Sequence, residues 1–116
     1  MPLFPGNTIK SYHVLSQLSP NATTATTAYT VPSAKSTTIS TIVVCNANAI
    51  PITFRISIRV AASADDIKQY LYYDVPVLGN DTFASTIGIT LTASDIISVY
   101  ASSTNVSFNI FGVEIS

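Results

Sequence analysis

The sequence predicts an all-β fold: an antiparallel β-sandwich of the jelly-roll type, with seven or eight strands and an extended N-terminal arm. Apolar and polar residues alternate along much of the chain from residue 36 onward, as they do in strands with one buried and one solvated face. Short segments rich in Asn, Ser, Thr and Gly interrupt this alternation, as turns between strands do. The 116 residues are enough for one two-layer domain.

The alternation is clearest in residues 52–60, where Phe54 belongs to the apolar set and Arg55 to the polar set. The polar turns at residues 46–49 and 102–105 lie between apolar runs, so we expect each of them to close a hairpin. One segment, residues 63–69, could form a single helical turn. The expected strands are residues 37–46, 52–60, 68–75, 83–91, 95–102 and 106–110.

The apolar residues near the C-terminus change parity after Ile110. Phe111, Val113 and Ile115 continue the apolar set on odd positions, and Gly112 lies where the parity changes. Because a glycine inside a strand often marks an extra, unpaired residue, the sequence predicts a β-bulge at Gly112.

The first 27 residues differ from the rest and predict an arm and linker, followed by a sandwich domain over residues 28–116. Leu3, Phe4 and Ile9 form an apolar tip, and residues 19–27 form a polar segment of low complexity. This order suggests an arm that reaches a neighbouring molecule. The alternative is a frayed terminus or an ordinary edge strand, since a weakly alternating strand is possible at residues 9–15.

The composition points to association with other protein surfaces. Only 9% of the residues are charged, against about 25% in an average domain, while 47% are hydrophobic. Five scattered Lys and Arg residues offer no cluster for phosphates, so we expect no nucleic-acid partner. The longest uncharged interval, residues 36–54, carries many Ser, Thr and Asn residues and Pro51, so we expect no membrane partner.

Residues that could support chemistry are few. His13 is the single histidine, and nothing in the sequence selects one of the six acidic residues to orient it. The single Cys45 lies in an apolar run and is typical of a small buried hydrophobe. We therefore expect no catalytic site, no cofactor and no metal site.

The most distinctive aromatic feature is the segment Tyr70, Leu71, Tyr72 and Tyr73. Regular alternation would place Tyr70 and Tyr72 on one face of a strand and the other two residues on the opposite face. Large side chains on both faces are typical of a strand that is buried on one side and contacts a partner on the other. The alternative is a core strand with its hydroxyl groups at the rim.

Residues 29–46 resemble the opening of a group of small tailed-phage virion proteins. Residues 95–102 and 106–115 resemble the ending of the same proteins, so that the likeness spans residues 28–116. It is a pattern of strands and turns without a catalytic motif. The resemblance implies one β-sandwich domain that assembles on a phage particle, often as a trimer, in one of several particle contexts.

Composition and resemblance together predict a non-enzymatic capsid decoration (cement) protein. Its expected partners are further copies of itself in a homotrimer, and the major capsid protein or another virion protein. Its expected location is the virion, after synthesis in the host cytoplasm. The candidate contact residues are Leu3, Phe4, Ile9, Tyr12, Tyr70, Leu71, Tyr72 and Tyr73.

A different class of function stays open at this point. A tail-fibre or baseplate module could bind a host receptor or glycan through the loops of the sandwich. The candidate loops for this alternative are residues 46–51, 79–82 and 102–105.

Overall fold

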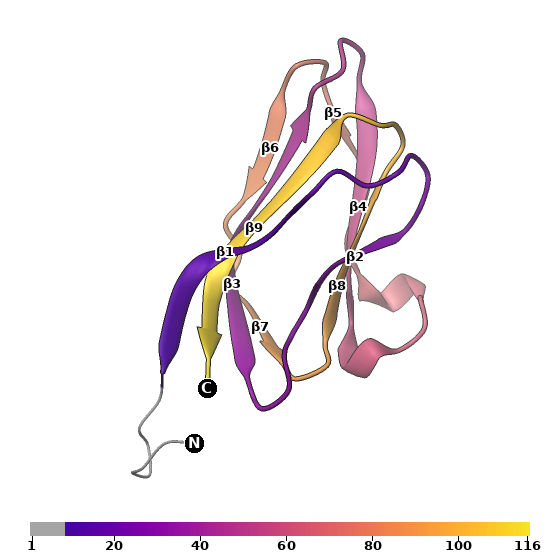
Figure 1. The fold of residues 1–116 in the computed structure, drawn as a ribbon. Helices are drawn as coiled ribbons and strands as arrows, with labels where there is room; N and C mark the ends of the chain where they lie inside the picture. The colour runs from indigo at the N-terminus through magenta and orange to yellow at the C-terminus, as the bar shows by residue number, and fades with distance from the viewer. Residues whose placement is uncertain (1–8) are drawn as a thin grey trace.

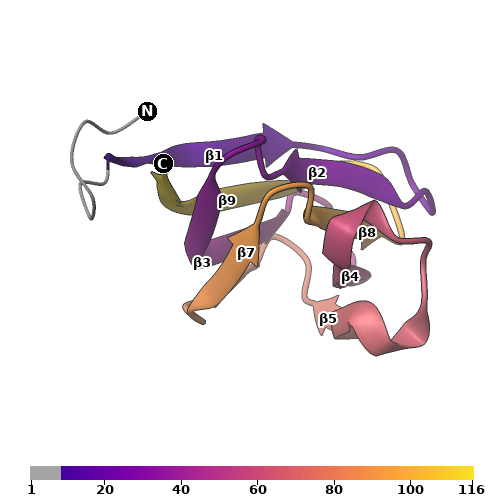
Figure 2. The ribbon, with the colours of Figure 1, turned by 90° about the horizontal axis from the view of Figure 1, so that it is seen from below.

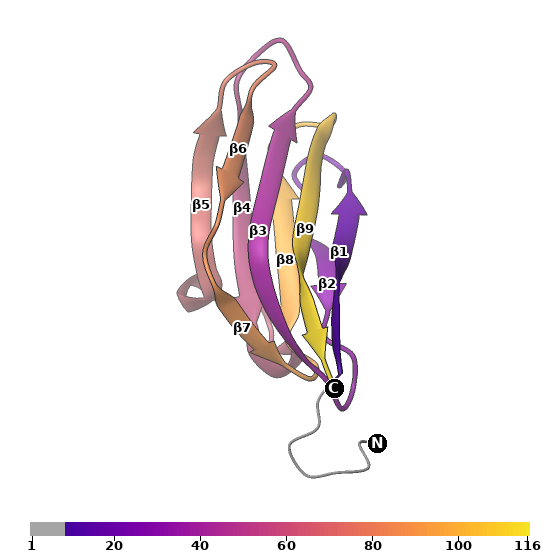
Figure 3. The ribbon, with the colours of Figure 1, turned by 90° about the vertical axis from the view of Figure 1, so that its left-hand side faces the viewer.

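The computed structural model describes residues 9–116, which form two antiparallel sheets packed face to face (Figures 1 and 2). The first sheet, seen from its outer side in Figure 3, has the strand order β1-β9-β3-β6, and β7 pairs with the other end of β3. It consists of β1 (Lys10–Leu18), β3 (Ser36–Asn46), β6 (Thr82–Ser85), β7 (Ile89–Thr92) and β9 (Val106–Ile115). The second sheet, in the order β2-β8-β4-β5, consists of β2 (Thr26–Thr30), β4 (Ile52–Arg59), β5 (Tyr70–Val77) and β8 (Ile96–Ala101).

The predicted antiparallel β-sandwich is confirmed, with nine strands where seven or eight were expected. The expected strand at residues 83–91 is divided into β6 and β7, which pair with the two ends of β3. The expected helical turn at residues 63–69 is a 3-10 turn, η2 (Ile67–Gln69), preceded by a second one, η1 (Val60–Ala62).

The two turns expected to close hairpins connect the two sheets instead. The turn after β3 leads from the first sheet to β4 in the second, and the turn after β8 leads back to β9 in the first. Among the described strands, β4 and β5 are the only consecutive pair that lie side by side in a sheet. Alternation shows that a strand has one buried face, but it does not show which strand lies beside it, so the hairpin prediction was wrong.

The core lies between the two sheets and is built from the inward residues of both. Phe54 is fully buried, and its ring lies 5.1 Å from that of Phe83, 6.0 Å from that of Tyr72 and 6.3 Å from that of Phe108. The predicted inward orientation of Phe54 is therefore confirmed. The other buried hydrophobic residues are Tyr29, Val31, Ile39, Ile42, Val44, Ile52, Ile56, Val77, Leu91, Ile97, Val99, Ala101, Val106, Phe108 and Ile110.

The N-terminal region contributes to both sheets from residue 10 onward. β1 pairs with β9 along its whole length, and β2 pairs with β8, so the boundary expected between residues 27 and 28 falls inside β2. Residues 10–18 are thus an edge strand of the sandwich, the alternative that the weak alternation had left open. Residues 1–8 lie outside the described residues, so an arm formed by them stays a prediction.

The irregularity expected at Gly112 lies in the strands on either side of it. The register of β9 shifts against β1 between Val14 and Ser16, and against β3 between Ile39 and Thr41. The extra, unpaired residue of each bulge therefore belongs to β1 or to β3. β9 itself has no extra residue at Gly112. A Cβ atom at Gly112 would lie only 2.3 Å from the carbonyl oxygen of Thr38.

Replacing Gly112 with alanine should lower the free energy of unfolding by about 1–3 kcal/mol, because the added methyl group meets backbone that cannot rotate away. Gly88→Ala is the matched control, since a Cβ atom there meets nothing within 4 Å. Urea unfolding of both variants checks this prediction. Equal midpoints for the two variants would show that β3 and β9 are not so close at Gly112.

Candidate interaction surfaces

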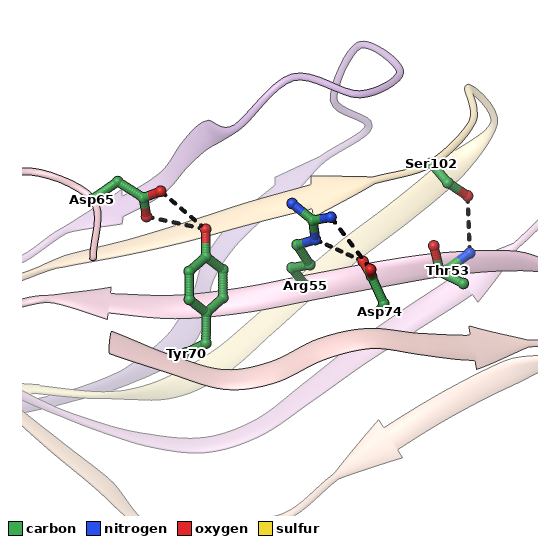
Figure 4. A network of polar contacts seen from close by, with 6 residues as sticks. All are labelled: Thr53, Arg55, Asp65, Tyr70, Asp74 and Ser102. Atoms are coloured by element: carbon green, nitrogen blue, oxygen red, sulfur yellow. Dashed lines mark hydrogen bonds and ion pairs between the residues drawn. The ribbon is translucent and has the colours of Figure 1, made fainter. Parts of the chain in front are cut away.

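The outer face of the second sheet carries a cluster built around Arg55, with Tyr70, Tyr73, Asp74 and Tyr100; we call it the tyrosine–arginine cluster. The guanidinium group of Arg55 lies 4.2 Å from the ring centroid of Tyr73 and 4.2 Å from that of Tyr100. Its Nε donates to Oδ1 of Asp74 over 2.6 Å, and its Nη2 donates to Oδ2 over 3.3 Å (Figure 4). The paired contact fixes the plane of the guanidinium group, which then holds both rings in place.

Tyr70 extends the cluster at one end. Its ring packs edge-on against that of Tyr73, with centroids 5.0 Å apart, and its hydroxyl group donates to both carboxylate oxygens of Asp65 (Figure 4). Burial, with a smaller effect of the hydrogen bond to Asp65, raises the pKa of Tyr70 above its usual value. The hydrogen bond to Asp74 raises the pKa of Arg55, which therefore stays charged. Rigid Tyr and Arg side chains of this kind are typical anchors of protein–protein interfaces.

The predicted grouping of the tyrosines is only partly met, because β5 contains two bulges. The register between β4 and β5 shifts on both sides of the pair Ile56–Tyr72, and the backbone at Asp74 has a φ of 53°. Tyr72 consequently points inward, where its hydroxyl group lies 2.5 Å from that of Ser85. Tyr70 and Tyr73 share the outer face, so the expectation that Tyr70 lies with Tyr72 was wrong.

Leu71 lies beside a separate groove near the 3-10 turns. The groove has a volume of about 490 Å³, and its lining residues are Ile58, Val60, Ser63, Lys68, Gln69 and Leu71. The side chain of Leu71 is 42% exposed. Of the four candidate residues at positions 70–73, three are therefore accessible to a partner and Tyr72 is largely committed to the core.

The outer face of the first sheet carries an apolar surface, which we call the β1–β9 face: Tyr12, Val14, Phe111, Val113 and Ile115. Tyr12 pairs with Val113 and Val14 pairs with Phe111, so the four side chains lie on one face. Tyr12 is 74% exposed and Val14 is 45% exposed, and the three residues from β9 are half-buried. The parity change after Ile110 thus places apolar residues outside, opposite to the inward Phe108 and Ile110.

A groove of about 420 Å³ runs over this face. Its lining residues are Tyr12, His13, Val14, Thr38, Ser40, Phe111, Gly112 and Val113. The predicted contact residues Ile9 and Tyr12 are both strongly exposed at this end of β1. They lie on the sheet opposite to Tyr70–Tyr73, so the structure divides the predicted contact residues between two surfaces, and Leu3 and Phe4 lie outside the described residues.

A polar centre closes the end of the sandwich below the β1–β9 face. Oε2 of Glu114 accepts a hydrogen bond from the hydroxyl group of Tyr29 over 2.6 Å, and the same hydroxyl group lies 2.8 Å from that of Thr37. Nε2 of His13 lies 3.5 Å from Oε1 of Glu114, and its Nδ1 lies 3.1 Å from the hydroxyl group of Ser11. Glu114 is therefore the acidic partner of His13, which the sequence alone could not identify. Together these contacts connect β1, β2, β3 and β9.

Because of this polar centre, we expect the free energy of unfolding to fall as the pH rises through the alkaline range. Burial, together with the hydrogen bond to Glu114, raises the pKa of Tyr29 from 10.0 to about 12. The folded state favours the neutral hydroxyl group of Tyr29 more than the unfolded state does. The stability that this difference contributes is complete below pH 10 and is lost as the pH rises toward 12. Unfolding in urea between pH 9 and pH 11.5 should show a steeper loss of stability for the native chain than for Tyr29→Phe. Equal slopes for the two chains would contradict the buried hydrogen bond.

The three candidate glycan loops meet at the opposite end of the sandwich, around the fully buried Asn46. Its Nδ2 donates to the carbonyl oxygens of Ile50, Val77 and Leu78, and its Oδ1 accepts from the backbone and side-chain N–H groups of Asn48. Nδ2 of Asn48 in turn donates to the carbonyl oxygen of residue 104. The sequence placed Asn46 in a polar turn, where an amide is a common signal, but it did not identify this side chain as the buried centre of the three loops.

Two structural findings concern metals and membranes. Across residues 9–116, no three His, Cys, Asp or Glu side chains come close enough to hold a metal ion. The same residues contain no helix with the length and hydrophobicity that a membrane span requires.

Comparison with known proteins yields a likeness of fold. No family model matches the sequence, and no curated protein matches it. A chain in the solved structure of infectious bursal disease virus, Gx strain, has a similar fold, with a TM-score of 0.53 and 9% sequence identity. The alignment covers 99% of this chain and 36% of the viral chain, so this protein spans about a third of that chain's length.

Proposed function

We propose that this protein is a non-enzymatic structural component of a phage particle, a capsid decoration (cement) protein that acts as a homotrimer. The observation that carries the proposal is the exposure of large apolar and aromatic side chains on the outer faces of both sheets of a domain with only 9% charged residues. A likeness of fold to a chain from a virus structure supports it. The sequence resemblance to small tailed-phage virion proteins agrees with it.

The two surfaces suit a protein that joins neighbouring shell subunits. Each Å² of apolar surface that leaves water contributes about 25 cal/mol, and the tyrosine–arginine cluster supplies rigid anchors at little cost in side-chain entropy. In a trimer, three such contacts act together, so that a weak single contact becomes a strong one through effective concentration. One surface is then available for the shell and the other for a second copy.

A binding experiment on particles tests the proposal. Purified protein is added to phage shells that lack it, and the temperature at which the shells release their DNA is measured. We expect the native chain to bind and to raise this temperature. Tyr73→Asp should abolish both effects, because it places a charge beside Asp74 and removes one of the rings that hold Arg55. Native chain that does not bind shells would contradict the decoration role.

Ile50→Asp is the control variant for this experiment. Ile50 is as exposed as Ile9, at 66%, but it lies in the loop after β3, away from both proposed surfaces. It should leave shell binding unchanged. Loss of binding in Ile50→Asp together with normal binding in Tyr73→Asp would place the shell contact on the loops.

A second candidate function, binding of a host receptor or glycan as a tail-fibre or baseplate module, has one observation in its favour. The loops at residues 46–51, 79–82 and 102–105 are joined by hydrogen bonds at one end of the sandwich, where the N–H of Asn80 donates to the carbonyl oxygen of Asn48 and Nδ2 of Asn48 donates to that of residue 104. A glycan array tests this function with the isolated protein. Selective binding that is lost in Ile50→Asp would favour it, and an array without binding would exclude glycans of the classes it displays.

A further inference from the structure

The groove on the β1–β9 face has the size and chemistry of a site for apolar side chains. Its volume of about 420 Å³ lies in the range of pockets that enclose small ligands, roughly 300–1,000 Å³. Phe111 and Val113 line it from β9, and Tyr12 and Val14 line it from the edge strand β1. None of its lining residues is an Asp, Glu, Lys or Arg. A charged ligand would therefore find no carboxylate, ammonium or guanidinium partner there to compensate for its lost water.

The chain itself contains a segment of matching chemistry directly before β1. Residues 1–8 have no charged side chain, and they carry Leu3 and Phe4 next to each other between two prolines. Prolines before and after a short segment reduce the entropy that it loses when it becomes ordered on a surface. The described chain begins at Ile9, whose N–H donates to the carbonyl oxygen of Ser116 while the N–H of Ser116 donates to that of Ile9. The segment therefore leaves the sandwich from a fixed point at the end of the β1–β9 face.

We propose that the groove on the β1–β9 face binds residues 1–8 of a second copy of this chain, with Leu3 and Phe4 against Tyr12, Val14, Phe111 and Val113. The segment of one copy meets the groove of another, so the contact can be exchanged reciprocally in a dimer or passed around a ring, and the proposed trimer is such a ring. The proposal rests on the self-association in the proposed function. It does not require a shell, so it can be tested in solution.

Reach favours a second copy over the chain's own segment. Leu3 and Phe4 lie six and five residues before Ile9, so an extended segment would let them reach about 17–22 Å from Ile9. To return to its own groove the segment must reverse, and Gly6-Asn7 is its two-residue turn signal. A turn at these two residues would place Phe4 opposite Ile9 and Leu3 opposite Lys10. Both would then lie about 7–10 Å short of Tyr12 and about 13–17 Å short of Val14 at the rise of a β-strand.

Cross-linking between two different chains tests the proposal. In a background in which the half-buried Cys45 is replaced by serine, one chain carries Phe4→Cys and a second chain, distinguished by mass, carries Val14→Cys. The two are mixed and treated with a short bismaleimide. We expect a covalent pair of one chain of each kind, because Phe4 of one copy lies beside Val14 of the next.

Leu71→Cys replaces Val14→Cys in the matched control, because it is similarly exposed, at 42% against 45%, but lies on the other sheet. The Val14 pair should form at about ten times the yield of the Leu71 pair, through the effective concentration of a bound segment. Equal yields would overturn the proposal. Cross-linking only within a chain that carries both Phe4→Cys and Val14→Cys would show that the segment covers its own groove. Cross-linking of Val14→Cys chains to each other alone would show that two copies meet face to face.

The assembly state gives a second, independent measurement. In sedimentation velocity we expect the native chain to form a trimer, and we expect Phe4→Asp to sediment as a monomer because a carboxylate cannot be buried in this groove. Asn7→Asp adds the same charge to the same segment outside the apolar pair, and it should stay assembled. A native chain that is monomeric at high concentration would overturn the inference, whereas shell binding by such a monomer would leave the proposed function standing.

Discussion

Replacing Phe54 with alanine should lower the free energy of unfolding by about 3–5 kcal/mol, the largest loss we expect from a single change in this chain. Phe54 is fully buried at the centre of the core, within 6.3 Å of the rings of Tyr72, Phe83 and Phe108, measured between centroids. Its removal takes apolar area out of the core and leaves a cavity lined by the three rings. The rings come from both sheets, so the sandwich cannot close over the cavity without moving one sheet.

Chemical denaturation with urea checks this expectation, with Phe54→Leu and Ile67→Ala as controls. Phe54→Leu keeps most of the volume and should cost less than the alanine variant. Ile67 is exposed in η2, so its truncation should change the stability by no more than about 0.5 kcal/mol. A loss below 1 kcal/mol for Phe54→Ala would show that the inward face of β4 has been assigned wrongly.

Asn46→Ala should have the second largest effect, a loss of about 2–4 kcal/mol. The side chain of Asn46 is fully buried, donates to three backbone carbonyl groups and accepts from both N–H groups of Asn48. Alanine removes all of these contacts at once. The carbonyl groups at residues 77 and 78 would then lose a partner close to the core, which costs more than the loss of an exposed hydrogen bond.

Two control variants separate the amide chemistry from the loss of volume. Asn46→Asp keeps the shape but turns carboxylate oxygens toward three carbonyl groups, so it should be at least as unstable as Asn46→Ala at neutral pH and should recover in acid. Asn109→Ala removes an exposed contact to Gln17 and should cost little. Equal stability of Asn46→Ala and Asn109→Ala would contradict the role of Asn46 as the centre of the loops.

Alternation predicted the fold class because it reports burial, and burial is what an antiparallel sandwich imposes on its strands. It placed Phe54 inside and Arg55 outside, as the structure does. It could not predict the path between the sheets, since the turns at residues 46–49 and 102–105 look the same whether they close a hairpin or cross from one sheet to the other. That choice depends on contacts between strands that are distant in sequence.

The candidate surfaces were predicted unevenly for the same reason. Tyr12 and Tyr73 are exposed, as a contact role requires, but Tyr72 is held in the core because two bulges in β5 break the strict alternation. The stacking of Arg55 against Tyr100 joins β4 to β8 and has no local signal in the sequence. Local patterns thus identified the strand that carries the cluster, and tertiary pairing determined its members.

The parity change after Ile110 shows how a correct observation led to a wrong expectation. A bulge in β9 would have returned Phe111 and Val113 to the core, which is the usual place for apolar side chains in a strand. The structure has the additional residues in β1 and β3, and these two side chains stay on the outer face. The pattern encodes an apolar surface, and this surface is the basis of the self-association that we propose.

The copy number of this chain in purified phage particles, measured by quantitative mass spectrometry against the major shell protein, tests the proposed function most directly. The decoration role predicts a ratio near that of the shell subunit, because the capsid lattice offers equivalent sites in that number. A ratio far below it would contradict decoration and favour the tail or baseplate. Complete absence of the chain from particles would contradict a structural role in the virion.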